Sequence, residues 1–300
     1  MQKFIGTGVA LVTPFKDDLS VDFDALVKLV NYNIENGTDY LVINGTTGES
    51  GTISEDEKQE VINVIIKTNN KRLPLILGVG GNNTSLVVEE LKTRNFTGLD
   101  GILSVAPYYS KPTQEGFYQH FKAIAQATEL PIILYNVPGR TSKNMEPATT
   151  LRLANNFDNI VAVKEAGNNK QQYYALLKDK PKDFLIISGD DDLALGVTLA
   201  GGSGVISVIG QAFPKQFSTM INHGLRGNNK EGYEIHYKMM DIINYIFEEN
   251  NPAGIKTVLQ ELDICKENVR LPLVKSSPQL KIKIAKFVKG TKKESVLKLL

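Results

Sequence analysis

Eight short, mostly apolar runs recur along the chain, and a segment with a helical pattern follows each of them. Continuous apolar runs of this length are typical of parallel β-strands that are covered on both faces. The runs are 8–15, 40–45, 73–79, 100–109, 131–137, 159–166, 183–191 and 204–210. Their number and spacing predict a (β/α)8 barrel, an α/β fold. The alternative is a doubly wound open sheet, but the turn after the first run lacks that fold's glycine-rich nucleotide fingerprint.

The helical segments carry recognisable end signals. The segment 22–37 ends in a glycine, Gly37, which is expected to cap the helix. The segment 54–70 starts at Ser54 with Glu57 three residues later, the spacing of a capping box. After about Gly224 the strand signals stop and three further helical segments follow. We therefore expect a barrel domain over residues 1–225 and a helical extension, packed against it, over residues 226–300.

Composition excludes several classes of protein. Hydrophobic residues make up 42% of the chain and charged residues 22%, which allows a large core. The net charge of +1 gives no electrostatic reason to expect nucleic acid or an anionic membrane as a partner. The single cysteine, Cys265, excludes an intrachain disulfide and fits a cytoplasmic location. Pro14 interrupts the N-terminal apolar run, so neither a membrane span nor a signal peptide is expected there.

The active site of a (β/α)8 barrel forms where the strands end, at their carboxyl termini. In this sequence those ends read NGTTGES, APYYSKP, YNVPGRT, VKEA, SGDD and GVISVIG. They are rich in hydroxyl groups and contain no histidine or cysteine, and the three histidines of the chain all fall in helical segments. No metal site is therefore expected. Asp190 and Asp191 could hold a divalent cation, although adjacent carboxylates at a strand end more often cap the next helix.

Lys164 ends an otherwise apolar strand, where a charged side chain is costly to bury. One interpretation is a lysine at the barrel rim that pairs with Glu165 or with an aspartate. The other is a nucleophile that forms a Schiff base, because partial burial lowers the pKa of an amine and lets it attack a ketone. The tyrosines and threonines at the same end of the barrel favour the second interpretation, since they relay protons without adding negative charge.

Three other segments also allow more than one function. NGTTGES is either a turn that caps a helix or a backbone nest for a carboxylate. Arg140 is either a surface residue or a two-pronged partner for a substrate carboxylate. The glycine-rich segment 199–207 could bind phosphate, as in many barrels, and physical arguments alone do not exclude this.

Taken together and in this order, GTTGES, PYYSKPTQEG, YNVPGRT, VKEA, SGDD and GVISV resemble the dihydrodipicolinate synthase family. The resemblance extends from about Gly6 to about Leu273. It also implies membership of the wider superfamily of pyruvate-dependent lyases that includes N-acetylneuraminate lyase. What it implies is a lyase of diaminopimelate and lysine biosynthesis, which condenses pyruvate with L-aspartate 4-semialdehyde by a class I aldolase mechanism and needs no cofactor beyond the covalent imine.

The resemblance also assigns roles to individual residues. Lys164 forms the imine with pyruvate, Tyr135 handles protons beside it, and Thr46 links Tyr135 to Tyr109 in a proton relay. Tyr109 reaches into the site of a neighbouring subunit, so a homo-oligomer is expected, commonly a tetramer built as a dimer of dimers. The remaining matches are positions that bind substrate: Thr47 for the pyruvate carboxylate, Arg140 for the semialdehyde carboxylate, and the backbone carbonyls of Gly189 and Ile206.

Relatives that are inhibited by lysine bind it near segments matching 49–58, 81–86 and the first tyrosine of PYY. Three residues keep the family's pattern there: Ser50, Asn82 and Tyr108. Other positions depart from it, since Glu55 and Lys58 stand where a histidine is typical and Leu86 replaces a glutamate. Leucine offers no acceptor to an ammonium group, and Lys58 would repel one. We therefore expect weak inhibition by lysine, or none.

Two other functions compete with this one. A sugar-acid aldolase of the same superfamily resembles the chain at the GTTGES loop and the lysine, but such members generally lack the arginine and the tyrosine pair. A barrel that only binds a keto acid would not need the complete set of Lys164, Tyr135, Thr46 and Tyr109.

Overall fold

The computed structural model describes residues 2–297 and contains a closed barrel of eight parallel strands, in the order in which they occur along the chain. The strands are β1 Gly6–Ala10, β2 Tyr40–Ile43, β3 Leu75–Gly78, β4 Gly101–Val105, β5 Ile132–Asn136, β6 Ile160–Glu165, β7 Leu185–Ser188 and β8 Gly204–Ser207. Each pairs with its neighbours, and β8 closes the barrel on β1. The predicted barrel is confirmed, and the alternative of an open sheet is wrong.

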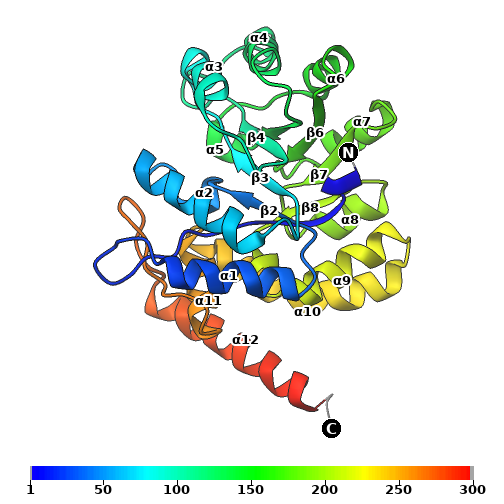
Figure 1. Ribbon diagram of the computed structural model, residues 1–300. Helices are drawn as coiled ribbons and strands as arrows, with labels where there is room; N and C mark the ends of the chain where they lie inside the picture. Colours follow the sequence, from blue (N-terminus) through cyan, green and yellow to red (C-terminus); the bar gives the residue numbers. More distant parts are fainter. Residues whose placement is uncertain (1, 298–300) are drawn as a thin grey trace.

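Helices surround the barrel and alternate with the strands (Figure 1). They are α1 Phe23–Glu35, α2 Glu55–Asn69, α3 Thr84–Thr93, α4 Gln114–Ala125, α6 Pro147–Asn156, α7 Lys170–Asp179, α8 Ala194–Leu199 and α9 Pro214–Leu225. A short helix, α5 Pro138–Thr141, follows β5, and 3-10 turns cover η1 Gln2–Phe4, η2 Thr46–Gly48 and η3 Ile209–Gln211. Within residues 2–297, no helix is long and apolar enough to cross a membrane.

The predicted end signals of α1 and α2 are present. Ser54 accepts a hydrogen bond from the Glu57 amide, and the Glu57 carboxylate accepts one from the Ser54 amide, which completes the capping box. Gly37 follows the last residues of α1 with a φ of 92°, a conformation that glycine adopts without strain. These local signals determine where the helices start and end. They therefore also determine the lengths of the loops that build the site.

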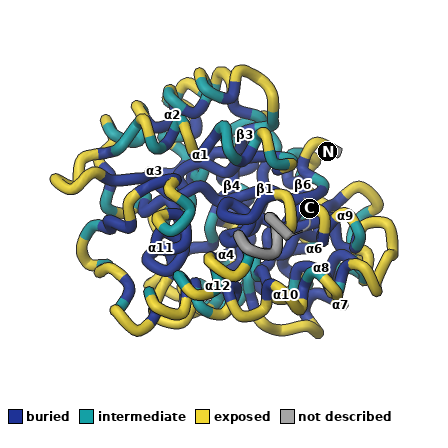
Figure 2. Tube along the Cα trace, turned by 90° about the horizontal axis from the view of Figure 1, so that it is seen from below, coloured by how far each residue is buried: buried dark blue, intermediate teal, exposed yellow. Residues whose placement is uncertain are grey.

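Residues of the strands alternate between two apolar clusters. One fills the barrel interior and includes Val42, Ile133 and Tyr135. The other lies between the strands and the helices and includes Leu41 and Leu134. Both faces of every strand are therefore covered, which explains the continuous apolar runs. Figure 2 shows the buried strands in the middle of the molecule and the exposed segments around them.

The alternation shifts once, at the start of β6. There Ile132 pairs with Ile160, but the next residue of β5, Ile133, pairs with Ala162, so Val161 is an extra residue. Such a bulge changes which residues of a strand face inward. Beyond it, Tyr135 lies opposite Lys164.

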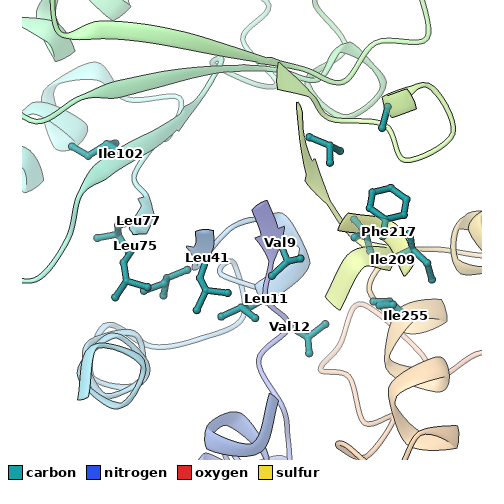
Figure 3. Close-up of a cluster of buried hydrophobic side chains, with 14 of the residues drawn as sticks. Val9, Leu11, Val12, Leu41, Leu75, Leu77, Ile102, Ile209, Phe217 and Ile255 are labelled. Carbon is teal, nitrogen blue, oxygen red and sulfur yellow. The ribbon is translucent and has the colours of Figure 1, made fainter. Parts of the chain in front are cut away.

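Three helices follow the barrel: α10 Asn229–Glu248, α11 Ala253–Glu261 and α12 Pro278–Leu297. The predicted helical character of this region is confirmed over the described residues. Ile255 of α11 lies with Val9 and Val12 in one apolar cluster (Figure 3). One core crosses residue 225, and the division into a barrel domain over residues 1–225 and a helical extension over residues 226–300 stays a prediction.

Candidate active site

Lys164 and Tyr135 face each other at the carboxyl ends of β6 and β5. The two residues are paired in the sheet, and the Lys164 Nζ lies 4.5 Å from the centre of the Tyr135 ring. Both side chains are at least nine-tenths buried, with 5% and 8% of their surface exposed. The strand pairing thus places an amine against a phenol inside the barrel mouth.

Burial lowers the pKa of Lys164 to about 8, because desolvation penalises the charged ammonium. The carboxylates of Asp191 and Asp190 act in the opposite direction but do not cancel this effect. In the part of the chain that the structure describes, no carboxylate lies within 4 Å of the Lys164 Nζ, and Glu165 binds elsewhere. The interpretation of Lys164 as an ion-paired rim residue is therefore wrong, and a substantial fraction of the amine is neutral near pH 8.

A cavity of about 400 Å³ opens over Lys164 at the carboxyl ends of the strands. Six of the residues predicted from the sequence line it: Thr46, Thr47, Tyr135, Arg140, Lys164 and Gly189. Ile206 lies in the cluster that fills the barrel interior. Of the described residues on β8 and just after it, Val208 lines the cavity instead. The predicted residues thus come together from four strand ends, those of β2, β5, β6 and β7, with the exception of Ile206 and Tyr109.

The NGTTGES segment forms the 3-10 turn η2, which brings both of its threonines to the cavity. Thr46 lies close enough to Tyr135 to favour its phenolate, but burial outweighs this effect and raises the pKa of Tyr135. Thr47 is buried, and its hydroxyl accepts a hydrogen bond of 3.0 Å from the Asn251 side-chain amide. The turn is thus tied to residues on both sides of the cavity.

Arg140 lies on α5, directly after β5, and its guanidinium is exposed at the rim of the cavity. It donates a hydrogen bond of 3.4 Å to the Asn251 carbonyl. Because its side chain is exposed and forms no ion pair among the described residues, the arginine can bind a carboxylate without breaking one.

The two tyrosines of PYY project away from the cavity. Tyr109 is 89% exposed and has a φ of 67°, which is unusual for a bulky residue. Tyr108 lines a second cavity of about 260 Å³ together with Ser50, and Thr46 and Tyr135 form a wall shared by both cavities. The predicted trio is therefore only partly assembled in one subunit, because Tyr109 stands apart from Thr46 and Tyr135.

The residues expected to differ at a lysine site are spread over two hollows. Glu55 and Lys58 line the second cavity, where Lys58 Nζ binds Glu55 Oε1 at 2.7 Å. Leu86 is 60% exposed and lines a neighbouring hollow. Asn82, on an exposed loop, is not among the described residues that line either one.

The carboxylates of SGDD have separate surroundings. Asp191 accepts hydrogen bonds from the Val208 and Ile209 amides at 3.1 and 2.9 Å, so it caps the turn after β8 and not helix α8, which follows it in the sequence. Asp190 lines the cavity, and mainly its burial raises its pKa to about 6. At Gly189 a Cβ would lie 2.5 Å from the Ala166 Cβ, which explains the glycine. Of the glycine-rich segment 199–207, residues 199–203 precede β8 and so lie away from the cavity, and the rest forms β8 itself.

Several residues at or near the site are not identified from the sequence alone. The C-terminal extension supplies Asn251 and Phe247 to the cavity. It also supplies Lys256, which is fully buried and forms an ion pair of 2.5 Å with Glu49 of the NGTTGES segment. These residues lie about 200 positions from their partners. The one available signal was the charged Lys256 within the apolar pattern of α11.

The comparisons with known proteins agree with this geometry. The model of the family described as "Dihydrodipicolinate synthetase family" matches residues 3–291. A 4-hydroxy-tetrahydrodipicolinate synthase from Flavobacterium psychrophilum is 56% identical over 98% of this chain and 100% of its own length. The crystal structure of dihydrodipicolinate synthase from Aquifex aeolicus superposes with a TM-score of 0.93 at 39% identity, over 96% of this chain and 98% of that one.

A third similar protein was solved with a ligand. It is the chloride-inhibited dihydrodipicolinate synthase from Acinetobacter baumannii, complexed with pyruvate. Its TM-score is 0.92 at 40% identity, over 95% of this chain and 98% of that one.

Proposed function

Since the chain belongs to the dihydrodipicolinate synthetase family, we propose that its Lys164 cavity carries out the reaction of a 4-hydroxy-tetrahydrodipicolinate synthase, a lyase of lysine biosynthesis. One observation supports the assignment of Lys164 most strongly. Its amine is buried, is not ion-paired among the described residues, and lies 4.5 Å from the centre of the Tyr135 ring in a cavity lined by hydroxyl groups. An amine with a pKa of about 8 is a competent nucleophile toward a ketone at neutral pH.

The chemistry proceeds through a covalent intermediate. The neutral Lys164 amine attacks the ketone carbon of pyruvate, and loss of water gives the imine. Removal of a proton from the methyl group gives an enamine, whose carbon attacks the aldehyde of L-aspartate 4-semialdehyde. The amine of the semialdehyde then attacks the imine carbon, which closes the ring and releases the lysine. The overall reaction joins the two substrates and releases one molecule of water.

Tyr135 serves as the proton carrier for these steps, because its ring lies beside Lys164 and it lines the same cavity as Thr46. As the phenol is buried and keeps its proton at neutral pH, it can donate to the oxygen that leaves during imine formation. Tyr109 of a second subunit would complete the relay toward solvent.

The two substrate carboxylates take separate places in the cavity. Thr47 and the amides of its turn bind the pyruvate carboxylate close to Lys164. Arg140 binds the semialdehyde carboxylate at the rim. The backbone carbonyl of Gly189 is proposed to line the pocket, whereas Ile206 lies in the barrel interior.

The experiment that tests this function has two parts. The protein is incubated with pyruvate and borohydride, and its mass is expected to rise by one reduced adduct. It is then given pyruvate with L-aspartate 4-semialdehyde, which it is expected to consume. An adduct with turnover of a sugar acid instead would indicate the related aldolase, and no adduct at all would indicate a barrel that only binds.

Replacing Arg140 with alanine is expected to impair use of the semialdehyde much more than formation of the pyruvate imine. A charge-assisted pair with a carboxylate is worth about 2–5 kcal/mol when desolvated, and the exposure of Arg140 points to the lower end. The measurement compares the Michaelis constant for semialdehyde with the rate of borohydride trapping. Arg152→Ala, at an exposed arginine of α6, is the control. If borohydride trapping and turnover fall equally, Arg140 does not act specifically on the second substrate.

Tyr109→Phe is expected to lose activity that returns in mixed oligomers. The exposed, left-handed Tyr109 fits a residue that acts in the site of a partner subunit. Mixing inactive Tyr109→Phe with inactive Lys164→Ala should restore part of the turnover, because one of the two sites in a hybrid dimer then combines intact residues. Tyr237→Phe, at an exposed tyrosine of α10, is the matched control. If the subunits are shown to exchange and turnover does not return, Tyr109 acts in the site of its own chain.

Inhibition by lysine is expected to be weak or absent. Glu55 and Glu90 both line the second cavity and could replace the missing acceptor, but Glu55 binds Lys58 and Arg94 at 2.7 and 3.2 Å, and Glu90 binds Arg94 at 2.9 Å. A ligand ammonium would have to displace these cations. The measurement is turnover with lysine titrated into the millimolar range, and Leu86→Glu should increase sensitivity. Strong cooperative inhibition of the unaltered protein below millimolar lysine would contradict the prediction.

The assembly into dimers of dimers and the location in the cytoplasm belong to the same proposal. The mass of the native particle tests the first, and fractionation of cells tests the second.

A further inference from the structure

A cluster of three amides and one carboxylate lies behind the barrel wall, on the side of β5 and β6 that faces away from the cavity. Its members are Asn136, Asn144, Glu165 and Gln172, and it is called here the amide–carboxylate cluster. Asn136 and Glu165 directly follow Tyr135 and Lys164, so strand alternation turns them outward. They are also paired with each other across the two strands. Each residue of the catalytic pair therefore has a neighbour in the cluster.

Glu165 is the centre of this cluster and receives hydrogen bonds on both carboxylate oxygens. Asn136 Nδ2 donates to Oε1 and Oε2 at 3.1 and 2.8 Å. Gln172 Nε2 donates to Oε2 at 2.7 Å, and the Gly167 amide donates to Oε1 at 2.9 Å. The carboxylate is 99% buried, and all of these partners are neutral donors. Burial raises its pKa to about 7, although these hydrogen bonds favour the ionised form.

The cluster reaches the segment that carries Arg140 as well. Asn136 Oδ1 accepts a hydrogen bond of 3.0 Å from the Met145 amide, and Asn144 Oδ1 accepts bonds from Asn136 and Gln172 at 2.8 and 3.1 Å. Residues 142–146 lead directly out of α5. At Gly167, a Cβ would lie 2.8 Å from Glu165 Oε1 and 3.3 Å from the Pro138 Cγ. The carboxylate therefore lies where β5, β6 and the start of α5 meet.

Burying a carboxylate without a cation costs free energy of folding. An apolar pair of residues would stabilise the contact between the two strands at least as well. What the polar pair provides is directional bonding. The bulge at Val161 makes the register between β5 and β6 dependent on contacts beyond it. A slip of one residue there would turn Lys164 to the other face of the sheet. The bond between Asn136 and Glu165 opposes that slip.

We propose that Glu165 is a positioning residue, which through Asn136 fixes β5 against β6 and so holds Tyr135 in place beside Lys164 while the imine forms. This role rests on the proposed function, because it concerns the same lysine. Neither Glu165 nor Asn136 touches the substrate; they act through Lys164 and Tyr135.

The first test is Glu165→Gln. An amide offers one acceptor in place of two, so one neutral donor would face another N–H group and the pairing would loosen. We expect the turnover number and the rate of borohydride trapping to fall about tenfold, because small misplacements of reacting groups cost rate even when the change is remote. The Michaelis constant for pyruvate should change by less than about threefold, since Thr47 is untouched.

The second test exchanges the two groups. In the double variant Asn136→Asp with Glu165→Gln, the carboxylate stands on β5 and the amide on β6, so the bond between the strands can form in the reverse sense. Each single variant is expected to be impaired and the double variant to recover most of the trapping rate, a coupling that simple loss of stability does not produce. Glu267→Gln, at a buried carboxylate of the extension, is the matched control for loss of stability.

The results separate the two proposals. If the unaltered protein forms no pyruvate adduct, the proposed function fails. If it forms the adduct and Glu165→Gln traps pyruvate at the same rate, only the positioning role fails. The role also fails if the exchanged double variant stays as impaired as the single ones. Should Glu165→Gln not fold, Gln172→Leu removes one donor and leaves both strands intact, and it must then slow trapping by about threefold for the role to stand.

Discussion

Replacing Lys164 with alanine is expected to abolish the covalent pyruvate adduct and to lower turnover on the order of 10⁴-fold or more, as for other residues that act as the nucleophile of a concerted set. The reason is that the imine formed by Lys164 withdraws electrons from the methyl carbon of pyruvate. Without the imine, the methyl proton of pyruvate is not acidic enough to be removed, and no hydroxyl group in the cavity can replace an amine in that role. The measurement is peptide mapping after borohydride reduction, together with turnover.

The control for this change is Lys170→Ala, which removes an exposed lysine at the start of α7. It should leave the adduct and turnover unchanged. The trapping rate of the unaltered protein should rise with pH and level off above about pH 8, because the neutral amine is the reactive form and its pKa is about 8. An adduct of equal yield in Lys164→Ala would assign the imine to another lysine.

The second large effect is expected at the other end of the NGTTGES segment, where Lys256→Met should destabilise the fold by about 3–5 kcal/mol. Lys256 and Glu49 are both fully buried and 2.5 Å apart, so removing the ammonium leaves a carboxylate without its cation in a dry environment. Lys256 also donates to the Asn268 carbonyl at 2.8 Å and lies over the Phe15 ring. Denaturation in urea measures the loss.

Two variants sharpen this test. Combining Lys256→Met with Glu49→Gln should recover part of the stability, because it removes the unpaired charge. Lys266→Met breaks an ion pair of the same length with Asp17, but that pair is exposed and should be worth less than about 1 kcal/mol. If Lys256→Met and Lys266→Met lower the free energy of unfolding by the same small amount, the buried pair contributes little to stability.

The strand runs and the end signals of α1 and α2 could be predicted because they depend on neighbours a few residues away. The inward direction of Lys164 could not, because the apolar residues that precede it hide the bulge at Val161. A uniformly apolar run carries no alternation from which to read which residues face the barrel interior.

The site was predictable where a residue's role depends on its own strand end, as for Thr46, Tyr135 and Arg140. It was not predictable where a partner comes from elsewhere. Asn251 and Lys256 belong to helical segments with no pattern that points to a loop 200 residues earlier. Leu86 shares one hollow with Glu55, but Lys58 lines the second cavity, where Leu86 does not reach.

The hydrogen bonds from the C-terminal extension to the NGTTGES segment join residues that are far apart in the sequence. This separation has a consequence for the synthesis of the protein. Thr47 and Asn251 are separated by 204 residues, and Glu49 and Lys256 by 207. A ribosome adding about 5–20 residues per second needs about 10–40 s to cover that distance. Throughout that interval the nascent chain already carries the threonine loop but not the side chains that secure it. The threonine loop therefore reaches its final packing only after all eight strands and residues 251–256 have been synthesised.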